Sequence, residues 1–145
     1  MNQQNRFAPP KSKVADFESF ENSAKIASLK VSEGWREKFR IIEKAGGPKL
    51  PKFRSVPYNE RKKIGFNGFG FLFGPLYYVA KGMWRKAITY FAGGVALIVV
   101  LAIVMDMLGF KDAEKYLGFA FAAAFAARAN IDYYQKMVLD DNEWW

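Results

Sequence analysis

Residues 65–105 read GFNGFGFLFGPLYYVAKGMWRKAITYFAGGVALIVVLAIVM, and this stretch decides the fold. Its second half, from Ala87 to Met105, holds 19 residues without a charge. At a rise of about 1.5 Å per residue they span about 28 Å, close to the hydrocarbon thickness of a bilayer. Ten of them are Ile, Phe, Val or Leu, which favour insertion by about 0.3–0.6 kcal/mol each. We therefore predict a transmembrane helix over 87–108. The alternative is a buried helix of a soluble domain.

The first half of the stretch, residues 66–80, is an aromatic segment broken by glycines, which we call the box. Its 15 residues reach about 22 Å as a helix, short of the roughly 30 Å needed to cross. Gly74 and Pro75 interrupt any helix there, because proline removes a backbone donor. Irregular backbone at membrane depth has to be covered by protein. The box is thus expected to be a re-entrant or interfacial element packed on the later helices.

A second hydrophobic segment follows a polar turn at 109–115. Only 116–127 is uncharged, so a crossing of about 28 Å requires the helix to continue to about residue 134. We predict this second transmembrane helix over 116–134. Arg128 and Asp132 then lie four residues apart on one helix face, as a candidate intramembrane polar pair. They form either a structural ion pair or a functional group.

Small residues on the two predicted helices are suited to close helix packing, because they let backbones approach each other. The packing lies either within one chain or between two copies. The candidate packing residues are Gly93, Gly94, Gly118, Ala122 and Ala126.

The polar N-terminal part divides into three pieces. Residues 1–13 contain a proline pair and show no apolar period, which predicts disorder. Residues 14–47 show helical spacing of apolar residues, and the clearest stripe is Trp35, Phe39 and Ile42. This candidate docking face packs either on the preceding helix or on a partner or membrane surface. Residues 48–63 form a Pro-rich basic linker, and residues 139–145 form an acidic tail.

Charge is strongly segregated along the chain. Residues 1–63 carry 15 Lys and Arg against 7 Asp and Glu, whereas residues 88–145 carry 4 against 7. The positive-inside tendency places the basic part in the cytoplasm, near anionic lipid headgroups. Nucleic acid is disfavoured as a partner, because acids are interleaved with the bases and no binding motif is present. The candidate headgroup contacts flank the box on both sides: Arg61, Lys62, Lys63, Lys81, Arg85 and Lys86.

Because these two clusters should share one face of the membrane, the box should not cross it. The predicted topology is multi-pass with both termini cytoplasmic. The chain has no cysteine and no histidine, and its acids are scattered singly. We therefore expect no catalytic, cofactor or metal site, and the composition argues against an enzyme.

Several motifs resemble a bacterial family of small inner-membrane proteins known only as a domain of unknown function. They are the Phe-Asn and Phe-Gly-Pro of the box, its Tyr pair, the Lys-Gly-Met-Trp loop, and Ala129–Tyr134, which reads ANIDYY. Upstream, Trp35–Phe39 and Ile42–Gly46 are similar to a cytoplasmic helix that precedes that domain. The resemblance covers about residues 32–138 and implies a membrane location and this architecture. It implies no activity.

Together these features predict an all-α integral membrane hairpin, preceded by a re-entrant or interfacial helix and a small amphipathic-helical cytoplasmic region. The location expected is the bacterial inner membrane. The function expected is that of a non-enzymatic interaction or accessory protein, with anionic lipids and either a protein partner or a second copy as partners. The alternatives are an immunity or exclusion protein against a toxin or phage, and an oligomeric, holin-like pore. An enzyme acting on lipid headgroups is the least favoured.

Overall fold

The computed structural model describes residues 11–110 and 113–144. All regular structure in these residues is helical, which confirms the all-α part of the predicted fold class. The predicted disorder at 1–13 falls largely outside the described residues, and residues 11–13 begin the first helix. In chain order the elements are α1 (Lys11–Ser28), α2 (Glu33–Lys44), the 3-10 helix η1 (Phe53–Ser55), α3 (Tyr58–Gly65), α4 (Gly68–Phe73), α5 (Pro75–Ala80), α6 (Trp84–Met107) and α7 (Ala113–Val138).

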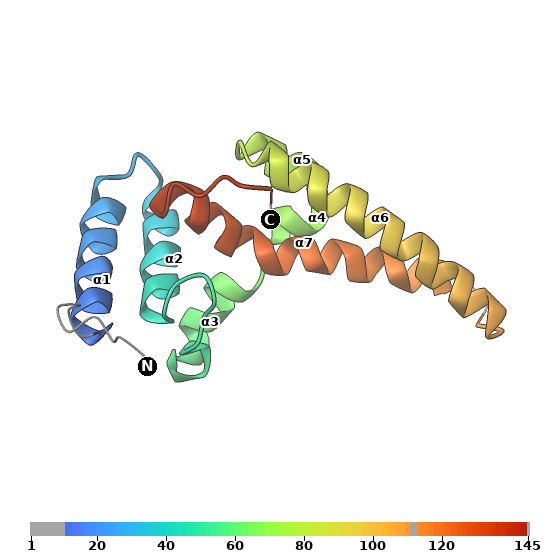
Figure 1. Ribbon diagram of the computed structural model, residues 1–145, viewed down its shortest axis with the longest axis horizontal. Coiled ribbons are helices and arrows are strands. Elements are labelled where there is room, and N and C mark those ends of the chain that lie inside the picture. Colours follow the sequence, from blue (N-terminus) through green and yellow to red (C-terminus); the bar gives the residue numbers. More distant parts are fainter. Residues whose placement is uncertain (1–10, 111–112, 145) are drawn as a thin grey trace, which may run out of the picture.

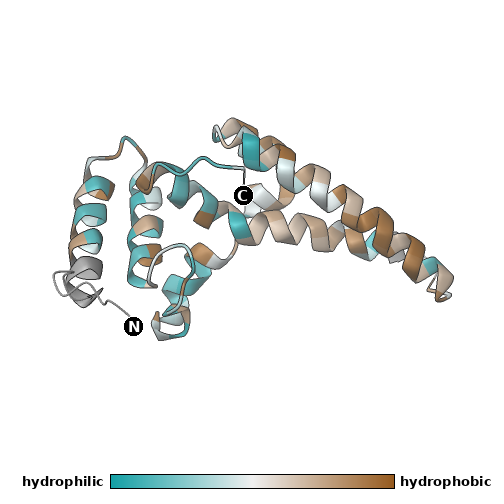
Figure 2. Cartoon of the chain, in the orientation of Figure 1, coloured by the Kyte–Doolittle hydropathy of each residue, from teal (hydrophilic) through white to brown (hydrophobic). Residues whose placement is uncertain are grey.

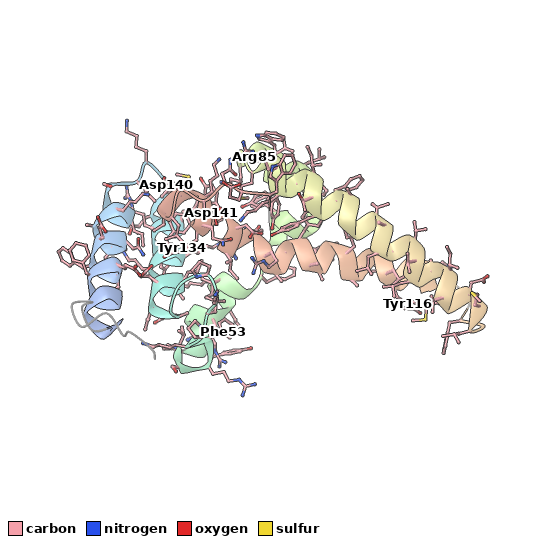
Figure 3. All side chains as sticks on the ribbon, viewed as in Figure 1. Phe53, Arg85, Tyr116, Tyr134, Asp140 and Asp141 are labelled. Carbon is pink, nitrogen blue, oxygen red and sulfur yellow. The ribbon has the colours of Figure 1, made fainter. Side chains whose placement is uncertain are left out.

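Two parts share the helix α7. At one end, α1, α2 and α3 gather around the C-terminal half of α7, and we call this part the bundle (Figure 1). From the bundle, α6 and the N-terminal half of α7 extend as an antiparallel hairpin, whose tip lies near the labelled Tyr116 (Figure 3). The bundle core holds side chains from both ends of the sequence, among them Ile26, Phe39, Tyr134 and Val138. The last helix therefore connects the polar and apolar parts.

The helix α6 is apolar and uncovered. Among the described residues it is the one helix long and apolar enough to cross a membrane, and none of its most apolar window is buried. Its exposed side chains make the hairpin the most hydrophobic part of the molecule (Figure 2). A core helix of a soluble domain would instead be mostly buried. The helix α7 does not meet the same criterion, so the second crossing over 116–134 stays a prediction.

The box consists of the two short helices α4 and α5, which meet at Gly74. That glycine has φ +44°, a conformation that side chains rarely adopt, and Pro75 starts the next helix directly. Asn67 caps α4 by accepting a hydrogen bond from the Gly70 backbone N–H at 3.0 Å. Gly70 lies against α7, where an added Cβ would be 3.0 Å from that of Ala129. The glycines and the proline thus let the box turn tightly and approach α7 closely.

Residues 48–63, expected to be an extended linker, contain η1 and most of α3. The prolines fall before and between these elements. Pro57 precedes the first residue of α3, where its lack of a donor costs nothing, and no proline follows within the helix. The spacing of prolines therefore sets where the helix begins and does not prevent it. The stripe of Trp35, Phe39 and Ile42 lies on α2, which is followed by Gly46 and Gly47 at positive φ.

Candidate functional site

Two groups of polar side chains lie where the hairpin meets the bundle, around the C-terminal half of α7. The first, the Asp132 cluster, comprises Tyr78, Lys86, Tyr90, Arg128 and Asp132. Asp132 accepts hydrogen bonds from the hydroxyls of Tyr78 (2.8 Å) and Tyr90 (3.4 Å). Its Oδ1 lies 3.6 Å from Lys86 Nζ and 3.2 Å from Arg128 Nη2. The cluster ties α5, α6 and α7 together through one carboxylate.

Burial differs sharply within the Asp132 cluster. The side chains of Asp132 and Lys86 are 0% and 1% exposed, whereas that of Arg128 is 46% exposed. Lys86 Nζ also donates to Gln135 Oε1 at 3.0 Å. Two cations therefore face one carboxylate, and the buried pair is held by several hydrogen bonds, which a desolvated ion pair needs for stability. This arrangement suits a structural role at the junction of three helices.

Arg128 also lines an apolar groove between α6 and α7. The groove has a volume of about 610 Å³, and the small residues Gly93, Gly94, Ala120 and Ala124 form part of its wall. Phe121 and Gly94 both line the groove, and a Cβ added to Gly94 would be only 2.0 Å from the Phe121 ring. Close approach of the two helices thus depends on that glycine and that ring.

An asparagine pair connects α3, the box and α7. Asn130 Nδ2 donates to the carbonyl of Ile64 at 3.0 Å, and its Oδ1 accepts from Asn67 Nδ2 at 2.9 Å. The Asn67 backbone N–H donates to the carbonyl of Ala126 at 3.0 Å. Both asparagines are buried. Buried amides with these partners are satisfied, so the pair fixes how the box sits on α7.

The second group is an open pocket, which we call the lysine pocket. It has a volume of about 630 Å³ and lies between the start of α2 and the box. The ammonium groups of Lys38 and Lys81 lie 4.6 Å and 4.9 Å from the centroid of the Trp35 ring. Lys81 also lies 4.7 Å from the ring of Tyr133, and Lys38 donates to Asn130 Oδ1 at 3.3 Å. Aromatic faces thus hold two cations from distant parts of the chain side by side.

Burial lowers the pKa of Lys38, and the nearby charge of Lys81 lowers it further. The pKa of Lys81 is likewise lowered, first by burial and then by the charge of Lys136. Within the described residues, neither ammonium group lies within ion-pair distance of a carboxylate. Partly desolvated cations without a counter-ion favour an incoming anion. The electrostatics of the lysine pocket therefore suit an anion better than a cation.

The structure distributes the six predicted headgroup contacts unevenly. Lys86 is buried in the Asp132 cluster and does not reach the surface. Lys63 pairs with Glu37, and Lys62 lies over the ring of Tyr58 at 4.6 Å. Arg61 lies between the rings of Phe53 and Tyr58, and Arg85 packs on Trp84 and Trp144. Only Lys81 lines the lysine pocket.

The predicted docking face is covered within the chain. Phe39 and Ile42 are fully buried, and Phe39 contacts the ring of Tyr134 at 5.9 Å between centroids. Trp35, half-buried, packs edge-on against Tyr133 at 4.6 Å. Trp35 and Phe39 therefore pack on α7, and Trp35 lies 98 positions before Tyr133 in the sequence. Tyr134 of α7 lies next to α2, as Figure 3 shows.

The predicted packing residues also separate. Ala126 lies under Gly70 of the box, and Gly94 lies under Phe121. Gly93 and Gly118 have no atom within 4 Å of an added Cβ, and Ala122 is half-buried. Of the predicted packing residues, Gly94 therefore serves the α6–α7 contact, and Ala126 serves the contact between α7 and the box.

Sequence reasoning did not single out Lys38, Asn67 or Asn130. Asn67 stands out as a polar residue in an otherwise apolar stretch, whereas Asn130 lies between Arg128 and Asp132, and Lys38 stands beside the Trp35 stripe. Among the residues that the structure describes, no group of three or more His, Cys, Asp or Glu side chains could hold a metal ion.

Comparisons with known proteins cover both parts of the molecule. A family model described as "Protein of unknown function (DUF2628)" matches residues 17–138. Curated relatives include the uncharacterized protein YigF of Salmonella typhimurium strain LT2, which is 27% identical over 122 residues that cover 79% of this chain and 90% of the relative. YigF of Escherichia coli K12 is 26% identical over 122 residues, with the same shares covered. No solved structure matches significantly. Since the matched residues include the bundle, the box and the hairpin, the chain belongs to the DUF2628 family.

Proposed function

We propose that this protein is an integral inner-membrane protein that acts by binding and not by catalysis. In this proposal the hairpin lies in the bilayer, and the basic bundle lies on the cytoplasmic face, where it holds anionic headgroups. The observation that carries the proposal is the exposed apolar surface of α6: within the part of the chain that the structure describes, no residue of its most apolar window is buried. In water such a surface would be a large exposed hydrophobic patch. In lipid it is the expected surface of a crossing helix.

The position of the cations supports this orientation. Helix α3, with Lys62 and Lys63, and the start of α6, with Arg85, lie at the bundle end of the hairpin (Figures 1 and 3). The hairpin tip lies at the opposite end. The positive-inside tendency then places the bundle in the cytoplasm. The exposed side chains Phe69, Leu72 and Leu76 of the box would lie at the inner interface of the bilayer, in the re-entrant position expected for it.

The Asp132 cluster favours a binding role over a pore. A water-filled pore needs polar side chains along the surface where copies meet. Asp132 is the one acid in 116–134, and Tyr78, Lys86 and the rest of its cluster bury it completely. The negative charge of Asp132 is thus compensated within the chain by Lys86 and Arg128. Membrane depolarisation on overexpression would support the holin-like alternative instead.

Membrane insertion and topology can be tested together in cells that express the full chain. The protein should stay in the membrane pellet after alkaline carbonate and urea extraction. Because the chain has no cysteine, single cysteines at exposed positions can report sidedness: Ser55, Ala80, Phe110 and Glu143. With an impermeant thiol reagent on intact cells, only Phe110→Cys should react. Labelling of Ala80→Cys with protection of Ser55→Cys would mean that the box crosses the membrane, and release by carbonate would refute the proposed location.

A further inference from the structure

The lysine pocket opens toward the apolar surface of the box. Phe66, Phe69 and Leu72 line it, and all three are largely exposed beyond it. Lys38 and Lys81 line the same pocket from α2 and from the loop between α5 and α6. A cationic end and an apolar end therefore adjoin in one cavity. Such a cavity is complementary to an amphiphile whose charged group is negative.

The start of α2 adds to the positive end. Ser32 and Gly34 line the pocket, and Ser32 makes no side-chain capping hydrogen bond to the helix. The space beside Gly34 is open. The first backbone N–H groups of a helix have no partners within it, and they carry the positive end of the helix dipole. Glu33, the acid nearest to them, is engaged by Arg36 at 3.0 Å and Arg40 at 2.9 Å.

We propose that the lysine pocket binds the phosphate group of an anionic membrane lipid, with Lys38 and Lys81 on the phosphate oxygens and the acyl part on the exposed side chains of α4. This inference rests on the proposed membrane location. A phosphate ester fits because two ammonium groups line the pocket beside the N-terminus of α2, whereas no carboxylate of the described residues lies within ion-pair distance of either. The adjoining box surface distinguishes a lipid from a soluble phosphate, which would leave that surface without a ligand.

Lipid binding can be measured on the purified full chain in detergent micelles, which separates it from insertion in cells. Native mass spectrometry would follow adducts of dioleoylphosphatidylglycerol, with dioleoylphosphatidylcholine as the neutral lipid. Lys38→Gln combined with Lys81→Gln should weaken phosphatidylglycerol binding about tenfold or more, because it removes two charge-assisted contacts. Lys38→Arg combined with Lys81→Arg should retain binding. The matched control, Lys49→Gln with Lys52→Gln, changes the net charge equally at exposed positions outside the pocket.

Three results would overturn the proposal. Equal losses in the pocket variant and in the matched control would mean that net charge alone attracts the lipid. If the natural chain bound phosphatidylglycerol and phosphatidylcholine equally well, the pocket would not select a negatively charged lipid. Glycerol 3-phosphate competing at the same concentration as the lipid would mean that the ligand is a soluble phosphate ester. If insertion fails in cells while the micelle result holds, the membrane location is wrong and the pocket assignment stands.

Discussion

The hydroxyl of Tyr78 donates a 2.8 Å hydrogen bond to Asp132 Oδ2, and both side chains are completely buried. This contact joins the box to α7 at the carboxylate that also neutralises Lys86. The surroundings of Asp132 explain how an acid is accommodated in the interior of the protein. A buried carboxylate is stable where cations and hydroxyl donors surround it.

Asp132→Asn should be strongly destabilising, because it leaves Lys86 buried without a counter-charge. The substitution keeps the shape of the side chain, so the loss reports on the charge. The expected loss is about 3–5 kcal/mol in the free energy of unfolding. Chemical denaturation in detergent micelles would measure it. Adding Lys86→Met should recover much of the loss, since the unpaired charge is then absent. A loss below about 1 kcal/mol for Asp132→Asn would contradict the role of the cluster.

Arg128→Ala should have a much smaller effect on stability. Its side chain is nearly half exposed and forms an i,i+4 pair with Asp132, which retains Lys86 as a partner. Pairs of this kind contribute about 0.3–1 kcal/mol. The same denaturation experiment provides the comparison. If Arg128→Ala left stability and membrane level unchanged and yet abolished a cellular phenotype, Arg128 would have a functional role beyond this pair.

Gly70→Ala should destabilise the protein, because an added Cβ would be 3.0 Å from the Ala129 Cβ and 3.3 Å from the Phe125 carbonyl oxygen. Overpacking of this kind costs about 1–3 kcal/mol. Gly118→Ala is the matched control within a helix, since nothing lies within 4 Å of its added Cβ. It should be neutral or stabilising by up to about 1 kcal/mol. Equal effects of the two substitutions would show that the box does not pack on α7 at Gly70.

Stability should increase with pH through Lys38 and Lys81. Burial lowers the pKa of each in the folded chain below the ordinary lysine value of about 10.4. Between the folded and unfolded pKa values the unfolded chain binds more protons, so the free energy of unfolding rises as pH rises toward about 10. The variant with Lys38→Gln and Lys81→Gln should lose this slope, measured in lipid-free micelles from about pH 7 to 10. The Lys49→Gln, Lys52→Gln control should keep it; a slope unchanged in the pocket variant would argue against desolvation of these lysines.

Local features of the fold follow from the sequence. The long apolar run predicts α6 to within a few residues, and Gly74 with Pro75 predicts the break in the box. Ser32 and the glycines at 46 and 47 delimit α2. Each of these depends on backbone preferences or on a run of apolar residues, which neighbours in the sequence determine.

Contacts between distant segments could not be predicted in the same way. The adjacency of Arg85 and Lys86 in the sequence does not tell which of the two cations faces inward, since neighbours on a helix point about 100° apart. Arg85 lies on Trp84 at the surface, whereas Lys86 points to Asp132. The lysine pocket depends on the packing of α2 against α7, which brings Lys38 near Lys81. The proximity of Lys38 and Lys81 is therefore determined by tertiary structure and not by local sequence.

The core of the bundle joins residues that are synthesised early to residues that are synthesised late. Phe39 and Ile42 emerge from the ribosome early, whereas Tyr134 and Val138, which complete the same core, are nearly the last residues synthesised. Contacts so distant in sequence form late, because a long loop must close first. In the proposed orientation, the hairpin that lies between them would have to enter the membrane before α7 returns to α2. Closure of the bundle would then coincide with completed insertion, and a chain truncated before Tyr133 would leave the apolar stripe of α2 exposed to proteases.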